Sequence, residues 1–169
     1  MEELKNLTGQ EASEKIKELS EKIKVCFLNT SAHGSFKNAR PMSQLEVDDQ
    51  GAIWFMSGKN STKVKEVSDD QSVELFYSDP STNQYMTLRG KADILFDQEK
   101  IYSLYNPLLN IWFKGKEDPE IALIKVIPED GFYWETKSNK LIQGVKMFVG
   151  LVTGNQTDDS EEGTLTMLA

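Results

Sequence analysis

Four residues between positions 40 and 63 have the side-chain types that bind a phosphate group. Arg40 carries one positive charge, and Ser61, Thr62 and Lys63 stand at the predicted start of a helix. The first turn of a helix has backbone N–H groups without intrahelical partners, and the helix dipole favours an anion there. Two cations, two hydroxyls and these N–H groups therefore predict a phosphate site, with Arg40 and Lys63 neutralising its charge.

Two strands and a helix are expected to bring these residues together. Asn38 to Val47 is predicted to be a strand, and the turn signal Asp48-Asp49-Gln50-Gly51 leads into a second strand, Ala52 to Ser57, completing a hairpin. A short helix is expected over Asn60 to Val67. Pro41 lacks the backbone N–H that a neighbouring strand would use, so its segment is an edge, a bulge or a place where something else lies alongside. A flavin ring could occupy that place.

The rest of the chain reads as short strands with a few helices between them. Thr8 to Lys22 has apolar residues at helical spacing, and further short helices are expected over 98–105 and 106–113. The remaining strands are predicted at 25–28, 71–77, 86–96, 121–127 and 132–134, with a turn at Glu129-Asp130-Gly131 between the last two. Gly90, in the middle of its strand, suggests a bulge or a close backbone approach. Strands joined mainly by turns favour an antiparallel barrel.

Composition narrows the classes of function. The chain has 169 residues and 38% hydrophobic residues, which suits one domain with a sizeable core. Its net charge of −8 argues against binding to nucleic acid or to an anionic membrane. With one cysteine, Cys26, and one histidine, His33, the chain is expected to have no disulfide and no Cys/His metal site. Cys26 is expected to lie in the core.

Both ends of the sequence also support predictions. The acidic residues near Met1 do not fit a signal peptide, and apolar stretches are too short to cross a membrane, so a cytoplasmic location is expected. Residues 1–152 are predicted to form the folded domain, in which Lys140 to Leu151 reads equally as a helix or a strand. Residues 153–169 carry four acidic residues and no Lys or Arg, which is typical of a flexible, solvated tail.

The order of these motifs resembles the FMN-binding split barrels related to pyridoxamine 5′-phosphate oxidase, and among them the general stress protein 26 group. The resemblance covers residues 10–150 and rests on Arg40-Pro41-Met42, Trp54-Phe55-Met56-Ser57, Ser61-Thr62-Lys63, the Gly90 strand and the segment from Trp112 to Pro119. It implies a mainly β fold with short flanking helices, namely a six-stranded antiparallel Greek-key split barrel. It also implies a homodimer that binds FMN in a groove between its two subunits.

The same resemblance implies roles for ten residues. Arg40, Ser61, Thr62 and Lys63 look like phosphate ligands, while Met42, Ser43, Met56 and Ser57 look like strand edges whose backbone meets the isoalloxazine ring. Trp134 resembles an aromatic residue that reaches the flavin from the other subunit. Gln84 lies one residue from the position where the family places an amide.

Departures from the oxidase pattern argue against pyridoxamine 5′-phosphate oxidation. Leu45 stands where the oxidase has a lysine, and Lys137-Ser138-Asn139-Lys140 stands where it has a segment with Arg and His, so the cations for the substrate phosphate are missing. The first expectation is therefore an FMN-dependent oxidoreductase whose substrate the sequence does not identify. A stress protein that sequesters FMN or FAD without turnover is the alternative, and a barrel that uses a deazaflavin as a diffusing cosubstrate is the third. No residue stands out as a catalytic acid or base.

Overall fold

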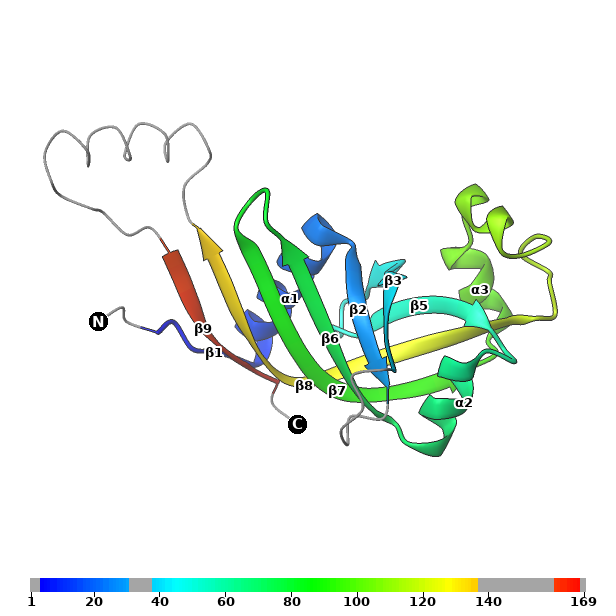
Figure 1. Ribbon diagram of the computed structural model, residues 1–169, viewed down its shortest axis with the longest axis horizontal. Coiled ribbons are helices and arrows are strands. Elements are labelled where there is room, and N and C mark those ends of the chain that lie inside the picture. Colours follow the sequence, from blue (N-terminus) through cyan, green and yellow to red (C-terminus); the bar gives the residue numbers. More distant parts are fainter. Residues whose placement is uncertain (1–3, 31–37, 137–159, 168–169) are drawn as a thin grey trace, which may run out of the picture.

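One strongly curved sheet organises the chain in the computed structural model, which describes residues 4–30, 38–136 and 160–167 (Figure 1). Its strands run in the order β1-β9-β8-β7-β6-β2-β3, with β5 beside β8 and β4 beside β5. Neighbouring strands are antiparallel, except that β1 and β9 are parallel. The strands are β1 (Leu7–Thr8), β2 (Val25–Thr30), β3 (Ala39–Ser43), β4 (Glu46–Val47), β5 (Ile53–Gly58), β6 (Ser72–Asp79), β7 (Gln84–Leu95), β8 (Ile121–Thr136) and β9 (Ser160–Thr166).

The segment that contains β3 and β4 links the two edges of the sheet. β3 pairs with β2, whereas β4 pairs with β5. Between them, the Gln44 N–H donates to the Lys24 carbonyl at 3.0 Å and the Leu45 N–H donates to the Trp54 carbonyl at 2.8 Å. The mainly β fold of the split-barrel class is therefore confirmed. With β3 and β4 taken as halves of one bent segment, β2 to β8 supply the six predicted strands, and β1 and β9 are additional.

Pro41 lies where its missing N–H costs least. It sits in β3, which ends the strand order and, among the described strands, pairs only with β2. Of the alternatives predicted for Pro41, the edge strand is the one found, whereas the hairpin before Ile53 involves only β4 and not the whole predicted strand. Within the described residues, no strand pairs with the other side of the β3 backbone.

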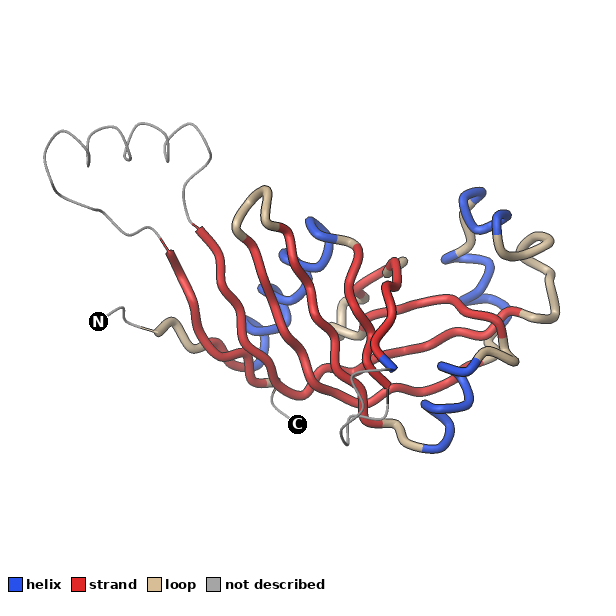
Figure 2. Tube along the Cα trace, viewed as in Figure 1, coloured by secondary structure: helices blue, strands red, loops and turns tan. Residues whose placement is uncertain are grey.

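The helices of the described chain pack around the sheet (Figure 2). They are α1 (Gly9–Ile23), α2 (Thr62–Asp69), α3 (Gln98–Leu104) and the 3-10 helix η2 (Pro107–Ile111). The apolar face of α1 packs in the main core with Leu28, Phe55 and Tyr133. A second core forms beneath α3 and η2, around Trp54, Met56 and Leu123. Cys26 is buried in the main core as predicted, and burial raises the pKa of its thiol to about 12.

The turn predicted at Glu129-Asp130-Gly131 is wrong, because β8 runs without interruption from Ile121 to Thr136. The residues typical of turns belong instead to an irregular pairing with β7, where the register shifts between Arg89 and Gly90. A Cβ at Gly90 would overlap the Ile127 carbonyl, and one at Gly131 would overlap the Thr87 carbonyl. Glycine is needed here because the two backbones approach too closely for a side chain, as predicted for Gly90.

Replacing Gly90 by alanine is expected to lower the free energy of unfolding by about 1–3 kcal/mol, because the added methyl group meets backbone that cannot move aside. Gly58→Ala is the matched control, since a Cβ there meets nothing within 4 Å. Urea unfolding of both variants measures the difference. Equal stabilities would contradict the close approach.

The predicted acidic tail is wrong over residues 160–166, which form strand β9. β9 pairs with β8 and β1, and Leu165 is fully buried in the main core. Glu161 is also buried and accepts a hydrogen bond from the Tyr133 hydroxyl at 3.1 Å. Because the segment is acidic, its composition did not indicate a strand, although every second residue of β9 faces inward. Residues 153–159, Lys140 to Leu151 and His33 lie outside the described residues.

Among the helices of the described chain, none combines the length and apolar character needed to cross a membrane.

Candidate functional site

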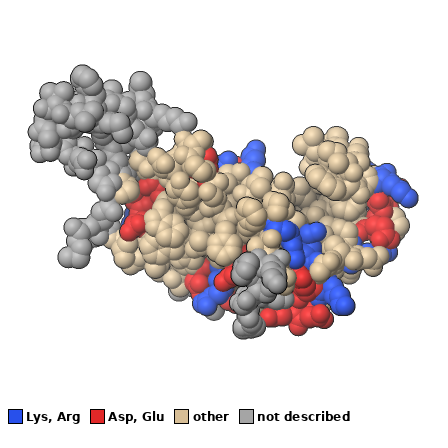
Figure 3. Space-filling model, viewed as in Figure 1, with Lys and Arg blue, Asp and Glu red and all other residues tan. Residues whose placement is uncertain are grey.

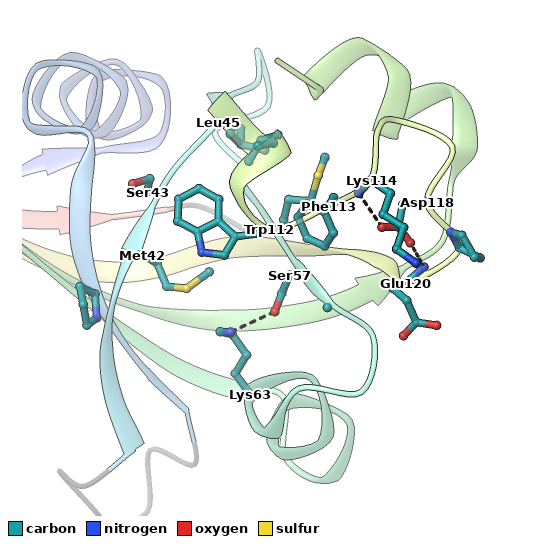
Figure 4. Close-up of a pocket in the computed structure, with 15 residues that line it drawn as sticks. Met42, Ser43, Leu45, Ser57, Lys63, Trp112, Phe113, Lys114, Asp118 and Glu120 are labelled. Atoms are coloured by element: carbon teal, nitrogen blue, oxygen red, sulfur yellow. Dashed lines mark hydrogen bonds between the residues drawn. The ribbon is translucent and has the colours of Figure 1, made fainter. Parts of the chain in front are cut away.

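A cavity of about 760 Å³ opens beside the edge strand β3 (Figure 4). One wall comes from β3 and the end of β5, and the other comes from η2 and the segment that follows it. Residues from several stretches of the chain line it: Pro41, Met42, Ser43, Leu45, Met56, Ser57, Gly58, Lys63, Leu109, Trp112, Phe113, Lys114, Asp118, Pro119 and Glu120. The cavity falls within the size range of small-molecule sites.

Five of the ten predicted site residues line this cavity: Met42, Ser43, Met56, Ser57 and Lys63. Among the described strands β3 lies at the edge, so the side of its backbone away from β2 has no strand partner there and can face the cavity. β5 is buried through Ser57, and after Gly58 the chain leaves the sheet and turns towards α2. The structure therefore brings these β3 and β5 residues to one wall of the cavity.

At one end of the cavity, Lys63 and two serines form a chain of hydrogen bonds. The Lys63 Nζ donates to Ser57 Oγ at 3.0 Å (Figure 4), and Ser57 Oγ lies 3.0 Å from Ser61 Oγ. Ser61 is the N-cap of α2, and its hydroxyl accepts from the Val64 N–H at 3.4 Å. The first turn of α2 carries no acidic residue that would satisfy the helix dipole. Donors therefore outnumber acceptors at this end.

Arg40 lies next to this group but does not line the cavity. Its NH1 donates to Thr30 Oγ1 at 2.8 Å, and its NH2 donates to Glu66 Oε2 at 2.8 Å. Thr30 also donates to Glu66. Although burial acts to raise the pKa of Glu66, the hydrogen bonds from Thr30 and Arg40 outweigh it, so the pKa is lowered and the carboxylate stays charged.

Arg40 and Lys63 are close enough to influence each other. Burial and then the positive charge of Arg40 lower the pKa of Lys63, while Glu66 acts in the opposite direction. Two cations and one carboxylate give a local charge of 1 + 1 − 1 = +1. Like charges that share a partly buried place are unfavourable unless an anion joins them, so this group fits a phosphate ligand.

The wall formed by η2 and the following segment was not predicted as part of the site. Leu109 and Phe113 are buried there, while Trp112 lines the cavity and remains 69% exposed. Asp118 shapes the end of this wall by accepting from the Lys114 N–H at 2.8 Å and the Glu120 N–H at 2.9 Å. Apolar residues in a short helix usually indicate core packing. The feature that distinguishes this wall is the high solvent exposure of Trp112, which cannot be read from the sequence.

Three predicted site residues are not at the cavity. Thr62 is exposed at the first position of α2 and does not line it. Gln84 is buried at the start of β7, where its side chain bonds to Thr82 and Glu135. Trp134 lies near the end of β8 and packs on Phe132, with ring centroids 4.6 Å apart. Within one chain, Gln84 and Trp134 both lie far from the end of the sheet that forms the cavity.

No cluster of three or more His, Cys, Asp or Glu side chains suited to a metal ion occurs within 4–30, 38–136 and 160–167.

The curved sheet, with the donor-rich cavity at its edge, defines a split barrel. The chain belongs to the pyridoxamine 5′-phosphate oxidase-like family, whose pattern matches residues 11–158. The predicted resemblance to the general stress protein 26 group is likewise confirmed.

Two relatives of known name match part of the chain. General stress protein 26 of Bacillus subtilis is 25% identical over 127 residues, which is 73% of this chain and 89% of that protein. Protein bli-3 of Neurospora crassa is 24% identical over 60% of this chain, but the matched part spans only 53% of that relative.

Two solved structures have the same fold. A general stress protein 26 from Jannaschia sp. superimposes with a TM-score of 0.79 at 25% identity, covering 91% of this chain and 97% of that one. The general stress FMN/FAD binding protein of Xanthomonas citri superimposes with a TM-score of 0.62 at 23% identity, covering 76% and 90%.

Proposed function

We propose that this protein binds FMN in the cavity beside β3 and acts as a flavin-dependent oxidoreductase. One observation carries the proposal: Lys63, Ser57 and Ser61 form a donor cluster beside Arg40, at the end of a cavity whose walls are otherwise largely apolar. FMN has two matching parts, a charged phosphate and a flat ring. The family and the Xanthomonas citri relative, whose name includes FMN/FAD binding, support the same ligand.

The residues present fit both parts of FMN. Lys63, Ser57 and Ser61 would hold the phosphate, with Arg40 adding charge and Thr62 lying beside them in the first turn of α2. Pro41, Met42, Ser43 and Met56 would meet the ring along the free edge of β3 and the end of β5. Bound FMN would supply hydride or electron transfer, and the protein would position the ring and shield it from water.

Thermal unfolding tests the cofactor assignment. A ligand that binds only the folded state stabilises it by about 2.7 kcal/mol at one hundred times its dissociation constant. Saturating FMN should therefore raise the melting temperature by several degrees, whereas riboflavin at the same concentration, without the phosphate, should raise it far less. An unmoved melting temperature with FMN would contradict the proposal.

A second candidate function is flavin storage without turnover. Asp118 is a carboxylate among the described residues that line the cavity. Backbone hydrogen bonds from Lys114 and Glu120 lower its pKa, so it stays charged and is a poor proton donor. A poor proton donor at the cavity favours binding without turnover. Reduction of the FMN-loaded protein by NADH or NADPH, followed by reoxidation with an added acceptor, would favour the enzyme. A bound flavin that is inert to both nucleotides would favour storage.

FMN affinity is expected to fall as the pH rises through a window below 10.5, the ordinary lysine pKa. Burial and Arg40 lower the pKa of Lys63, so its amine loses its proton at a lower pH than an exposed lysine. Only the charged amine attracts phosphate, so losing the proton weakens binding. Fluorescence titrations from about pH 7 to pH 10 measure this. Lys63→Arg keeps its charge, so its FMN affinity should change less with pH than that of the wild type. Identical pH profiles for the two proteins would show that Lys63 is not part of the phosphate site.

A homodimer is the second part of the proposal. Phe27, Phe76 and Phe132 lie in one row across β2, β6, β7 and β8, with Thr87 between the last two, and Phe27 and Phe76 are 52% and 40% exposed. Figure 3 shows a broad area without charged side chains on this face. Contiguous exposed aromatic residues favour a protein interface. A second copy packed there could also bring Trp134 to the partner's flavin.

Light scattering tests the dimer: the mass should be twice the 19.1 kDa of the chain. Phe27→Asp with Phe76→Asp should shift it to the monomer mass. A wild-type monomer at micromolar concentration would contradict a stable dimer.

A further inference from the structure

Lys63 combines access to the cavity with two features that make an amine nucleophilic. Its side chain lines the cavity, and its Nζ is held 3.0 Å from Ser57 Oγ. Burial and the adjacent charge of Arg40 both lower its pKa, so a larger fraction is neutral at neutral pH. Desolvation and a neighbouring cation are the two ways in which proteins activate lysine as a nucleophile.

Two other lysines show the contrast. Lys15 is also largely buried, but it is ion-paired with Glu135 at 2.5 Å and Glu18 at 3.1 Å. Burial acts to lower the pKa of Lys15, yet the hydrogen bonds that Lys15 donates to these carboxylates outweigh it and the pKa is raised, so this amine keeps its proton. Lys65 is exposed on the same helix as Lys63 and does not line the cavity.

We propose that Lys63 is an acylation site for small acyl phosphates, which dock at the same donor cluster assigned above to the FMN phosphate. The donors Ser57 and Ser61 would hold the phosphoryl oxygens of the reagent beside the Lys63 amine, and the neighbouring Arg40 would add positive charge. The neutral amine then attacks the acyl carbon. A C–N bond forms, the bond between the acyl carbon and the phosphate oxygen breaks, inorganic phosphate leaves, and the surplus proton on nitrogen passes to water.

Acylation would control cofactor loading. The amide that forms has no charge, so the local charge of the cluster falls from +1 to 1 − 1 = 0, with Arg40 and Glu66 left paired. The modified protein would then bind FMN weakly. Conversely, bound FMN would cover Lys63 and prevent acylation. This regulatory consequence rests on the proposed function, whereas the reactivity of Lys63 does not.

The test exposes the full-length, flavin-free protein to acetyl phosphate and follows each lysine by peptide mass spectrometry. Lys63 is expected to react about fivefold faster than Lys65, because it is the more nucleophilic amine and lies beside a phosphate dock. Acetic anhydride, which has no phosphate, should show a smaller preference. Excess inorganic phosphate should slow the reaction at Lys63 with acetyl phosphate and leave Lys65 unchanged.

The outcomes separate this inference from the cofactor assignment. If Lys63 reacts no faster than Lys65, the acylation site is overturned, whether or not FMN binds. If Lys63 is preferred and inorganic phosphate protects it but FMN does not, the acylation site stands and the cofactor assignment fails. Lys63→Gln, which mimics the acylated side chain, should lower FMN affinity at least tenfold by this account. Lys65→Gln is the matched control and should leave FMN affinity unchanged.

Discussion

Replacing Arg40 and Lys63 together by alanine is expected to weaken FMN binding by about 10² to 10⁴-fold. Each hydrogen bond to a charged group contributes roughly 1.5–3 kcal/mol, so two contribute roughly 3–6 kcal/mol, and each 1.4 kcal/mol is tenfold in the dissociation constant. The loss of Arg40 also leaves the Glu66 carboxylate, which it now binds at 2.8 Å, without its cation close to the phosphate. Flavin fluorescence titration measures the change.

Riboflavin provides the decisive comparison, since it has the ring but not the phosphate. Its affinity for the double variant should stay within about fivefold of the wild-type value, because the ring contacts come from β3 and β5. Lys65→Ala with Arg89→Ala removes the same charge from exposed positions away from the cavity and serves as the control. Equal losses for FMN and riboflavin would show that Arg40 and Lys63 do not act on the phosphate.

Leu165→Ala is expected to lower the free energy of unfolding by about 2–5 kcal/mol, the usual range for truncating a fully buried leucine. Leu165 lies in β9, pairs with Leu7 of β1 and Gly131 of β8, and belongs to the main core. Guanidinium unfolding followed by circular dichroism measures the loss.

The adjacent position supplies the control for Leu165. Thr164 points to the other side of β9 and is only partly buried, so Thr164→Ala should change stability by less than about 1 kcal/mol. If Leu165→Ala were as mild as Thr164→Ala, the acidic C-terminal segment would not be part of the folded domain.

Local sequence patterns correctly predicted those helices and strands that do not depend on contacts with distant parts of the chain. The apolar spacing of α1, the alternation in β7 and the missing donor of Pro41 each reflect a nearest-neighbour rule, and each was confirmed. Met56, Ser57 and Lys63 lie within one strand, turn and helix, so local patterns were enough to expect them close together, and they line the same cavity.

The errors came from contacts between segments far apart in the chain. Glu129-Asp130-Gly131 reads as a turn, but its backbone is held in β8 by pairing with β7, where Gly90 allows the close approach. β9 reads as solvated because it is acidic, yet β1 and β8 bury its inward-facing residues. The pairing of Arg40 with Glu66 likewise requires β3 and α2 to be adjacent, which no local spacing reveals.

The visible absorption spectrum of the freshly purified protein, followed by mass analysis of what denaturation releases, tests the central claim most directly. The donor cluster at Lys63 and the free edge of β3 predict a yellow protein that releases FMN in about equimolar amount, or a colourless one that turns yellow on reconstitution with FMN. A colourless protein that takes up neither FMN nor riboflavin at saturating concentration would contradict the account.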